Sequence, residues 1–141
     1  MNTDGFVGVS GVEDHFEYFD PQTGKFFILP WDPDNTFSSQ GEKPTRSIYS
    51  RFDANALAKI VHGSAVLRAQ YQARIAAVMT AVPIEAVQAE ADRIYNQIRD
   101  TAYEDQVKMF TNGTFDWGHS YVKDFVAQRY ANLRQQLGLP P

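Results

Sequence analysis

The sequence predicts an α+β fold that is mostly α, with an N-terminal β-hairpin followed by a four-helix C-terminal subdomain. Two aromatic-rich runs flank a turn that contains Pro21 and Gly24, and four amphipathic segments follow from residue 54 onward. The chain has 141 residues, of which 43% are hydrophobic, enough for one ordinary domain with a buried core. We divide it into a hairpin and loop segment, residues 1–53, and a helical subdomain, residues 54–141.

The hairpin is expected between Asp14 and Pro30, with its strands at residues 15–19 and 25–29. Pro21 fixes the backbone at the first turn position and Gly24 accepts a positive φ, which together favour a type I turn followed by a bulge. Two strands alone are only marginally stable in water. We therefore expect this ribbon to lie on helices or to pair with strands outside these residues.

The segment from Asp32 to Asp53 is rich in Ser, Gly, Pro, Asn and charged residues. It is longer than the usual connection between two elements of a compact domain. We expect it to be either a functional loop or a mobile one.

The first two predicted helices follow this segment. A short apolar helix is expected over residues 54–62, closed by Gly63, and Ser64 is placed to cap the second helix. Apolar residues at helical spacing predict the buried face of the second helix. These residues are Leu67, Tyr71, Ile75, Val78 and Met79.

The third and fourth helices are longer. Pro83 fits the first position of the third helix, and Asn112 with Gly113 is expected to end it. The fourth is expected to begin near Trp117 or His119. The expected buried positions are Ile84, Val87, Ala91, Ile94, Tyr95, Ile98 and Ala102 in the third helix, and Val122, Phe125, Val126, Tyr130, Leu133 and Leu137 in the fourth.

An aromatic cluster of Phe110, Phe115 and Trp117 lies between the two long helices in the sequence. Core packing is the favoured interpretation of this cluster. A platform for a carbohydrate or another ligand is the alternative.

Composition excludes several functional classes. The chain has no Cys, which excludes disulfides, thiolate zinc sites and cysteine nucleophiles. Its 13 Lys and Arg against 17 Asp and Glu give a formal charge of -4, so it lacks the dense basic surface of nucleic-acid-binding proteins. No apolar run approaches the roughly 20 residues of a membrane span. The three histidines lack metal-ligand spacing and are expected to be surface or partly buried imidazoles.

The candidate site begins where the second strand ends. Asp32 and Asp34 directly follow an apolar run, and two such carboxylates can share one hard cation. The alternative is an Asx-Pro turn in which both carboxylates only bond local backbone N–H groups. Asp4 and Asp14 are further carboxylates at the entry to the hairpin, and the hairpin can return the chain toward Asp32.

Two motifs carry a resemblance to a known family. The hairpin sequence YFDPQTGKF, residues 18–26, leads into LPWDPDNTF, residues 29–37. This combination resembles the signature of the CotH kinase family, the spore coat protein H group. Residues 55–60, 67–71 and 122–130 resemble the helical tail of that family, so the resemblance spans most of the chain.

The resemblance implies the C-lobe part of an atypical protein-kinase-like fold. Such a kinase transfers the γ-phosphate of ATP to Ser or Thr of spore coat or secreted proteins, with Mg²⁺ or Mn²⁺. By position, Asp32 resembles the metal-binding aspartate, Asp34 is its neighbour in the motif, and Asp14 is a further oxygen ligand where the family commonly has Asn. Asp4 resembles the base that accepts the proton of the substrate hydroxyl. The implied location is the spore coat, the cell surface or the exterior, although no signal peptide is recognisable in these residues.

The same resemblance predicts that the chain is a C-terminal fragment of a larger domain. The glycine-rich loop, the phosphate-binding Lys and its Glu partner lie upstream in kinase-like chains, so we expect this polypeptide alone to have little or no kinase activity. Ser38 also departs from the Gly that usually follows the motif. A non-catalytic interaction module of a spore coat or cell-surface protein is the alternative function. An unrelated helical structural domain is a third.

Overall fold

The computed structural model describes residues 5, 7, 14–37 and 43–140. The contacts between Cα atoms divide the chain into two compact units, Met1–Tyr71 and Gln72–Pro141. The predicted α+β, mostly α class is confirmed, because a two-stranded hairpin is followed by four α-helices and the only other helices in the described residues are two short 3₁₀ turns. The domain boundary between residues 53 and 54 stays a prediction.

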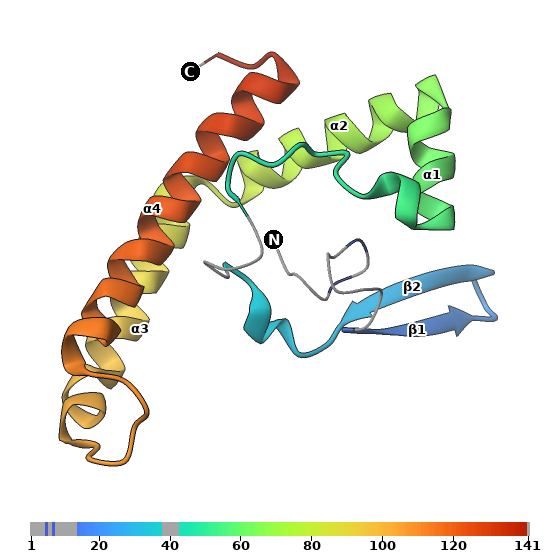
Figure 1. Cartoon of the computed structure of the whole chain (residues 1–141). Coiled ribbons are helices and arrows are strands. Elements are labelled where there is room, and N and C mark those ends of the chain that lie inside the picture. The colour runs from blue at the N-terminus through green and yellow to red at the C-terminus, as the bar shows by residue number, and fades with distance from the viewer. Residues whose placement is uncertain (1–4, 6, 8–13, 38–42, 141) are drawn as a thin grey trace. The chain divides into compact units, whose positions relative to one another are not determined.

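The hairpin of the first unit is antiparallel and is confirmed in the predicted place (Figure 1). Strand β1 (His15–Asp20) pairs with β2 (Lys25–Pro30), from His15 opposite Pro30 at the open end to Asp20 opposite Lys25 at the turn. Gly24 has the predicted positive φ of 66°. Its N–H donates to the Asp20 carbonyl at 2.8 Å, which closes the turn.

The Asp20 side chain reinforces this turn. Its carboxylate accepts hydrogen bonds from the Thr23 hydroxyl at 2.6 Å and the Gln22 N–H at 2.9 Å. The Thr23 bond, followed by the Gln22 bond, lowers the pKa of Asp20 below its usual value. The local bonding that favours Asp in turns therefore fixes the register of the whole ribbon.

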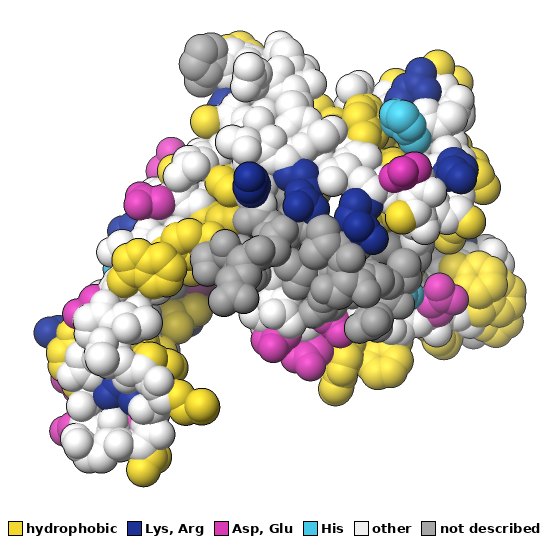
Figure 2. All heavy atoms as spheres, viewed as in Figure 1, with side chains coloured by type: hydrophobic (Ala, Val, Ile, Leu, Met, Phe, Trp, Pro, Cys, Tyr) yellow, Lys and Arg dark blue, Asp and Glu magenta, His cyan; other side chains and the backbone are white. Residues whose placement is uncertain are grey.

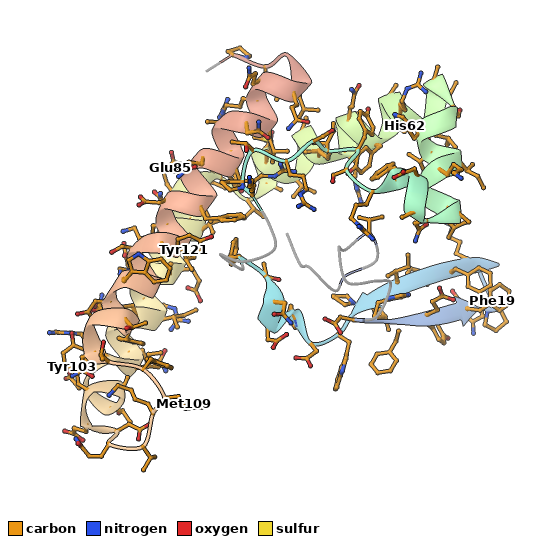
Figure 3. The ribbon with its side chains drawn as sticks, viewed as in Figure 1. Phe19, His62, Glu85, Tyr103, Met109 and Tyr121 are labelled. Carbon is orange, nitrogen blue, oxygen red and sulfur yellow. The ribbon has the colours of Figure 1, made fainter. Side chains whose placement is uncertain are left out.

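Large apolar side chains cover both faces of the hairpin and stay open to solvent. Cross-strand partners form ring pairs, among them Phe19 and Phe26 with centroids 4.9 Å apart. Every large apolar side chain from Phe16 to Trp31 is between 44% and 72% exposed. Figure 2 shows apolar side chains gathered at the turn end of the hairpin, where Figure 3 labels Phe19.

Residues 43–55 lead into the helical part of the first unit. They include a 3₁₀ turn, η2 (Phe52–Ala54), and Asn55, whose side chain accepts a hydrogen bond from the Ala58 N–H at 3.0 Å. This cap starts helix α1 (Ala56–Gly63) two residues later than predicted. Helix α2 (Ala65–Ala81) follows, with the predicted cap at Ser64, whose hydroxyl accepts from the Leu67 N–H at 3.4 Å.

The second half of the expected loop is packed rather than free. Ile48 and Phe52 are each only 5% exposed. The Phe52 ring contacts Tyr49, His62 and Tyr71, with centroids 5.6, 6.4 and 5.3 Å away. The Tyr71 hydroxyl also donates to the Ile48 carbonyl at 3.0 Å. This aromatic cluster holds residues 48–52 against α1 and the first half of α2.

The second unit is built on helices α3 (Ile84–Glu104) and α4 (Asn112–Leu137), which lie side by side (Figure 1). The prediction that Asn112 and Gly113 end the third helix is wrong, as is the start of the fourth near Trp117. Thr111 caps α4, because its side chain accepts a hydrogen bond from the Thr114 N–H at 3.1 Å. The Asn-Gly pair therefore opens a helix instead of closing one.

Part of the predicted helical core is also wrong. Phe125 and Val126 are buried, at 2% and 4% exposure, but Ile94 and Ile98 are each 44% exposed. In the described residues the extensive packing of α3 is with α4, so the far edge of its apolar stripe stays uncovered. None of the helices described here is long and apolar enough to cross a membrane.

The aromatic cluster does not form the predicted core: Phe115 is half-buried, and its ring stacks on Tyr95 with centroids 5.2 Å apart. Phe110 and Trp117 are 50% and 55% exposed, so core packing is wrong for these two. Phe110 lies in the connection before α4, and Trp117 stacks on Tyr121 on the surface of the helix. Neither side chain has a second layer of protein over it in the described part of the chain.

Candidate metal-binding site

The two ends of the hairpin bring Asp14 next to the motif that follows β2. The Trp31 N–H donates to the Asp14 carbonyl at 3.1 Å, which continues the antiparallel ladder by one step beyond His15 and Pro30. The Trp31 ring packs edge to face on Phe16, with centroids 5.1 Å apart. Asp14 is therefore the cross-strand neighbour of Trp31, and Asp32 is the next residue along the chain.

Asp32 turns the chain away from the ribbon. Its backbone is left-handed, with φ 44° and ψ 62°, a conformation that few residues other than Gly adopt and that Asp tolerates better than most. Asp32 precedes the 3₁₀ turn η1 (Pro33–Asn35) but its side chain makes no capping bond to it. The carboxylate is exposed and accepts no hydrogen bond from the described residues. Uncommon backbone conformations of this kind cluster at functional sites.

Asp34 lies within η1 and is also exposed. Its carboxylate accepts a hydrogen bond from the Asn35 side-chain amide at 3.1 Å. The turn itself is closed by a backbone bond, from the Thr36 N–H to the Pro33 carbonyl at 3.0 Å. In the described residues, then, the turn does not use the Asp32 or Asp34 carboxylate as an acceptor for backbone N–H groups.

The donor chemistry of these residues fits a hard divalent cation. Carboxylate oxygens are the ligands that Mg²⁺ and Mn²⁺ prefer, and Mg²⁺ is commonly held by one or two carboxylates, with phosphate and water completing its shell. The described residues contain no group of three or more His, Cys, Asp or Glu side chains placed to hold a metal by themselves. The carboxylates of Asp14, Asp32 and Asp34 are therefore not gathered into one set of three ligands, and Asp14 is placed near the motif only through its backbone bond to Trp31. Asp32 or Asp34 could each supply a carboxylate to an open site. Asp4 lies outside the described residues.

A second cluster of ionisable side chains, which no sequence motif indicates, lies on the α3 and α4 pair. Asp92 of α3 lies 2.8 Å from Nε2 of His119 and accepts hydrogen bonds from the Lys123 ammonium at 2.8 and 2.9 Å. The Lys123 bonds, then the His119 bond, lower the pKa of Asp92. The His119 ring also stacks on Tyr95, with centroids 4.2 Å apart.

The cluster continues along the helices through Asp116. Its carboxylate accepts hydrogen bonds from the hydroxyls of Tyr95 at 2.7 Å and Tyr103 at 2.7 and 2.8 Å. The bond to Asp116, followed by burial, raises the pKa of Tyr95 to about 12. In the sequence, the members on each helix are spaced three, four or eight residues apart, which predicts that they share a helix face. Which side chains pair across the two helices depends on the register between the helices, which the spacing does not give. These bonds join α3 to α4 and all their members have partners, so we assign the cluster a structural role.

A comparison with known protein families matches a range that includes both the strand-end motif and most of the helical part. The family described as CotH kinase protein matches residues 1–133. No curated protein and no solved structure matches the chain. The matched residues include all four candidate aspartates, the hairpin and most of α4. The chain therefore belongs to the CotH kinase protein family.

Proposed function

We propose that this chain supplies the metal-binding part of a protein kinase that transfers the γ-phosphate of ATP to Ser or Thr of a protein substrate. One observation carries the proposal. Asp32 holds an exposed carboxylate, without a hydrogen bond in the described residues, on a left-handed backbone at a strand end that lies within the residues matched by the family.

The reaction forms a bond between the substrate hydroxyl oxygen and the γ-phosphorus and breaks the bond from that phosphorus to the β,γ-bridging oxygen, which releases ADP. In the proposal, Asp4 takes the hydroxyl proton as general base. Asp32 would hold Mg²⁺ or Mn²⁺ together with a carboxylate of Asp34 or Asp14, and phosphate oxygens and water would complete the shell. When bound, such a cation neutralises charge on the phosphate oxygens and relieves the repulsion between neighbouring carboxylates.

The substrate class and the location belong to the same proposal. The substrate would be a coat or secreted protein, and the site of action the spore coat, the cell surface or the exterior. Support for both comes from the family match alone, because a composition free of Cys suits either redox environment.

A non-catalytic interaction module is the second candidate, and one observation favours it. The hairpin exposes aromatic side chains on both faces, far more apolar surface than a two-stranded ribbon keeps open without a covering partner. This candidate predicts protein binding without any requirement for nucleotide or metal.

The two candidates separate in a nucleotide-binding experiment. A fluorescent, non-hydrolysable ATP analogue is titrated with the chain, with and without Mn²⁺, and anisotropy is recorded. The kinase proposal predicts binding that requires Mn²⁺ and is lost in Asp32→Ala. The matched control is Asp53→Ala, which removes an exposed carboxylate from η2 in the same unit and should bind as the wild type does.

Binding of the analogue that is equally strong without Mn²⁺, or unchanged in Asp32→Ala, would remove Asp32 from the proposed role. Absence of nucleotide binding combined with saturable binding of a coat or surface protein would favour the interaction module.

A further inference from the structure

An open pocket of about 510 Å³ lies on one face of the hairpin in the first unit. Alternate residues of a strand share a face of the sheet, and so do cross-strand partners. Tyr18 and Phe27 are such partners, and each has a further lining residue two positions away on its own strand. The pocket is lined by Tyr18, Asp20, Pro21, Gln22, Phe27 and Leu29. The two strands and the turn therefore form its walls together.

Two exposed aromatic rings belong to this pocket. The rings of Tyr18 and Phe27 are tilted by 34° to each other, with centroids 6.4 Å apart, and the two residues are 53% and 44% exposed. The face of an aromatic ring carries negative partial charge and attracts a cation that lies within about 6 Å of the ring centre. The pocket therefore offers a surface that favours a cation, and a flat cation can also stack on it.

A carboxylate completes the pocket. Of the six described residues that line it, only Asp20 is charged. Its Oδ1 accepts a hydrogen bond from the Gln22 N–H at 2.9 Å, and its Oδ2 accepts one from the Thr23 hydroxyl at 2.6 Å. Each oxygen of a carboxylate has two acceptor positions. Within the described residues, one acceptor position therefore stays available on each oxygen.

The cross-strand partner of Asp20 does not use these positions. Lys25 lies opposite Asp20 in the register of the hairpin. It is not among the residues that line the pocket, and no ion pair joins it to Asp20 in the described part of the chain. The bonds from Thr23 and then Gln22 keep the pKa of Asp20 below its usual value, so the carboxylate is charged at neutral pH. The pocket thus presents an open negative charge beside two aromatic rings.

We propose that this pocket binds the guanidinium group of an Arg side chain from a partner protein. Two parallel N–H groups of the guanidinium donate to Oδ1 and Oδ2 of Asp20, one to each open acceptor position. The plane of the guanidinium then packs on the ring of Tyr18 or Phe27. The paired acceptor positions are the reason for choosing Arg over Lys, because the ammonium group of Lys is a compact point charge without the matching fork of donors.

The turn holds the carboxylate in place before a partner binds. The Gly24 N–H donates to the Asp20 carbonyl at 2.8 Å, and the two side-chain bonds of Asp20 close the same turn. A site that is already formed loses less conformational freedom on binding. The turn that fixes the hairpin therefore also prepares the Arg site.

The inference stands apart from the functions proposed above. None of the lining residues belongs to the strand-end site, so the kinase proposal does not depend on it. The interaction module needs only the exposed apolar faces of the hairpin, and the Arg site adds a partner chemistry that this candidate leaves open. A failure of the Arg site and a failure of either function are thus separate results.

Titration of the ¹⁵N-labelled chain, followed by NMR, tests the Arg site. The probes are three capped peptides with two Gly residues on each side of a central Arg, Lys or citrulline, which has the shape of Arg without its charge. The Arg peptide should shift the amide signals of Tyr18, Gln22 and Phe27 with a dissociation constant on the order of 1 mM, because one side chain makes few contacts. The Lys peptide, which loses one charge-assisted bond, should bind about tenfold more weakly. The citrulline peptide should leave the signals unchanged.

Variants on the two faces of the hairpin separate the site from general attraction. Asp20→Asn removes the charge and one acceptor oxygen and should weaken binding of the Arg peptide by about tenfold or more. Tyr18→Leu removes one ring and should weaken it about two- to fivefold. The matched controls are Glu17→Gln and Phe26→Leu, which remove a charge and a ring from the opposite face and should bind as the wild type does.

Cross-strand nuclear Overhauser effects of every variant report whether the hairpin is intact. If Asp20→Asn loosens the turn, Tyr18→Leu still tests the site, because it leaves the bonds of the turn in place. The proposal is overturned if the Arg peptide gives no saturable shifts in the wild type, or if the Lys or citrulline peptide binds as tightly as the Arg peptide. It is also overturned if the pocket variants that keep an intact hairpin bind the Arg peptide as the wild type does.

Discussion

The aromatic cluster around Phe52 makes a quantitative prediction about the segment that follows the candidate metal site. Phe52→Ala removes a ring that is 5% exposed and contacts Tyr49, His62 and Tyr71. Loss of the transfer free energy of a buried Phe, together with the cavity left behind, costs about 3–5 kcal/mol. Three edge-on or tilted ring contacts place the expected loss in the upper part of that range.

The matched control is Phe26→Ala, the same substitution at a hairpin position that is 72% exposed. It should cost less than about 1 kcal/mol, because little apolar surface is removed from a buried environment. Urea denaturation followed by circular dichroism measures the free energy of unfolding, and hydrogen exchange of peptides from α1 localises the loss to the first unit. Equal effects of the two substitutions, or unchanged exchange in α1, would refute the view that residues 48–52 anchor this segment.

Three further predictions concern local structure. Asn55→Ala should cost about 1 kcal/mol by removing the acceptor of the Ala58 N–H, with faster hydrogen exchange at the start of α1, whereas Asn55→Asp should restore protection. Gly138→Ala, at the C-terminal cap of α4, should cost about 1 kcal/mol in thermal unfolding through backbone strain alone, because φ is 65° and no atom lies within 4 Å of the added Cβ; an unchanged midpoint would contradict the cap. The raised pKa of Tyr95 means that its contribution to stability is complete below pH 10.0 and is lost as the pH rises toward about 12. In Tyr95→Phe the free energy of unfolding should depend less on pH across that window. A pH profile identical to that of the wild type would show that the Tyr95 hydroxyl does not contribute to stability through its bond to Asp116.

The hairpin could be predicted from sequence because its determinants are local. The Pro21 ring fixes φ at a value that suits the turn, and Gly24 accepts the positive φ that its turn position requires. The aromatic runs on either side favour strands. The start of α4 could not be predicted, because residues of the types of Asn112 and Gly113 are found at both ends of helices. The side chain of Thr111 decides between the two, and a capping Thr is a weaker signal than an Asn-Gly pair.

The place of the candidate site in the chain could be predicted from the sequence, but the backbone conformation at the site could not. The order of residues after β2 places Asp32 at a strand end, and the hairpin register brings Asp14 beside Trp31. The left-handed backbone of Asp32 depends on how the chain leaves the ribbon, which the spacing of carboxylates does not specify. The pairing of Asp92 with Lys123 likewise needs the register of two helices, which no local pattern encodes.

Direct titration with Mn²⁺, followed by the loss of the electron paramagnetic resonance signal of the free ion, tests the central claim most directly. The wild-type chain should bind the cation, and Asp32→Ala should weaken binding at least about tenfold, the loss that follows even from removing an indirect partner of a metal ligand. Asp53→Ala, the control in the same unit, should leave the affinity unchanged. If Asp32→Ala binds Mn²⁺ as tightly as the wild type, or if all three proteins fail to bind it, the assignment of a metal site to the end of β2 is contradicted.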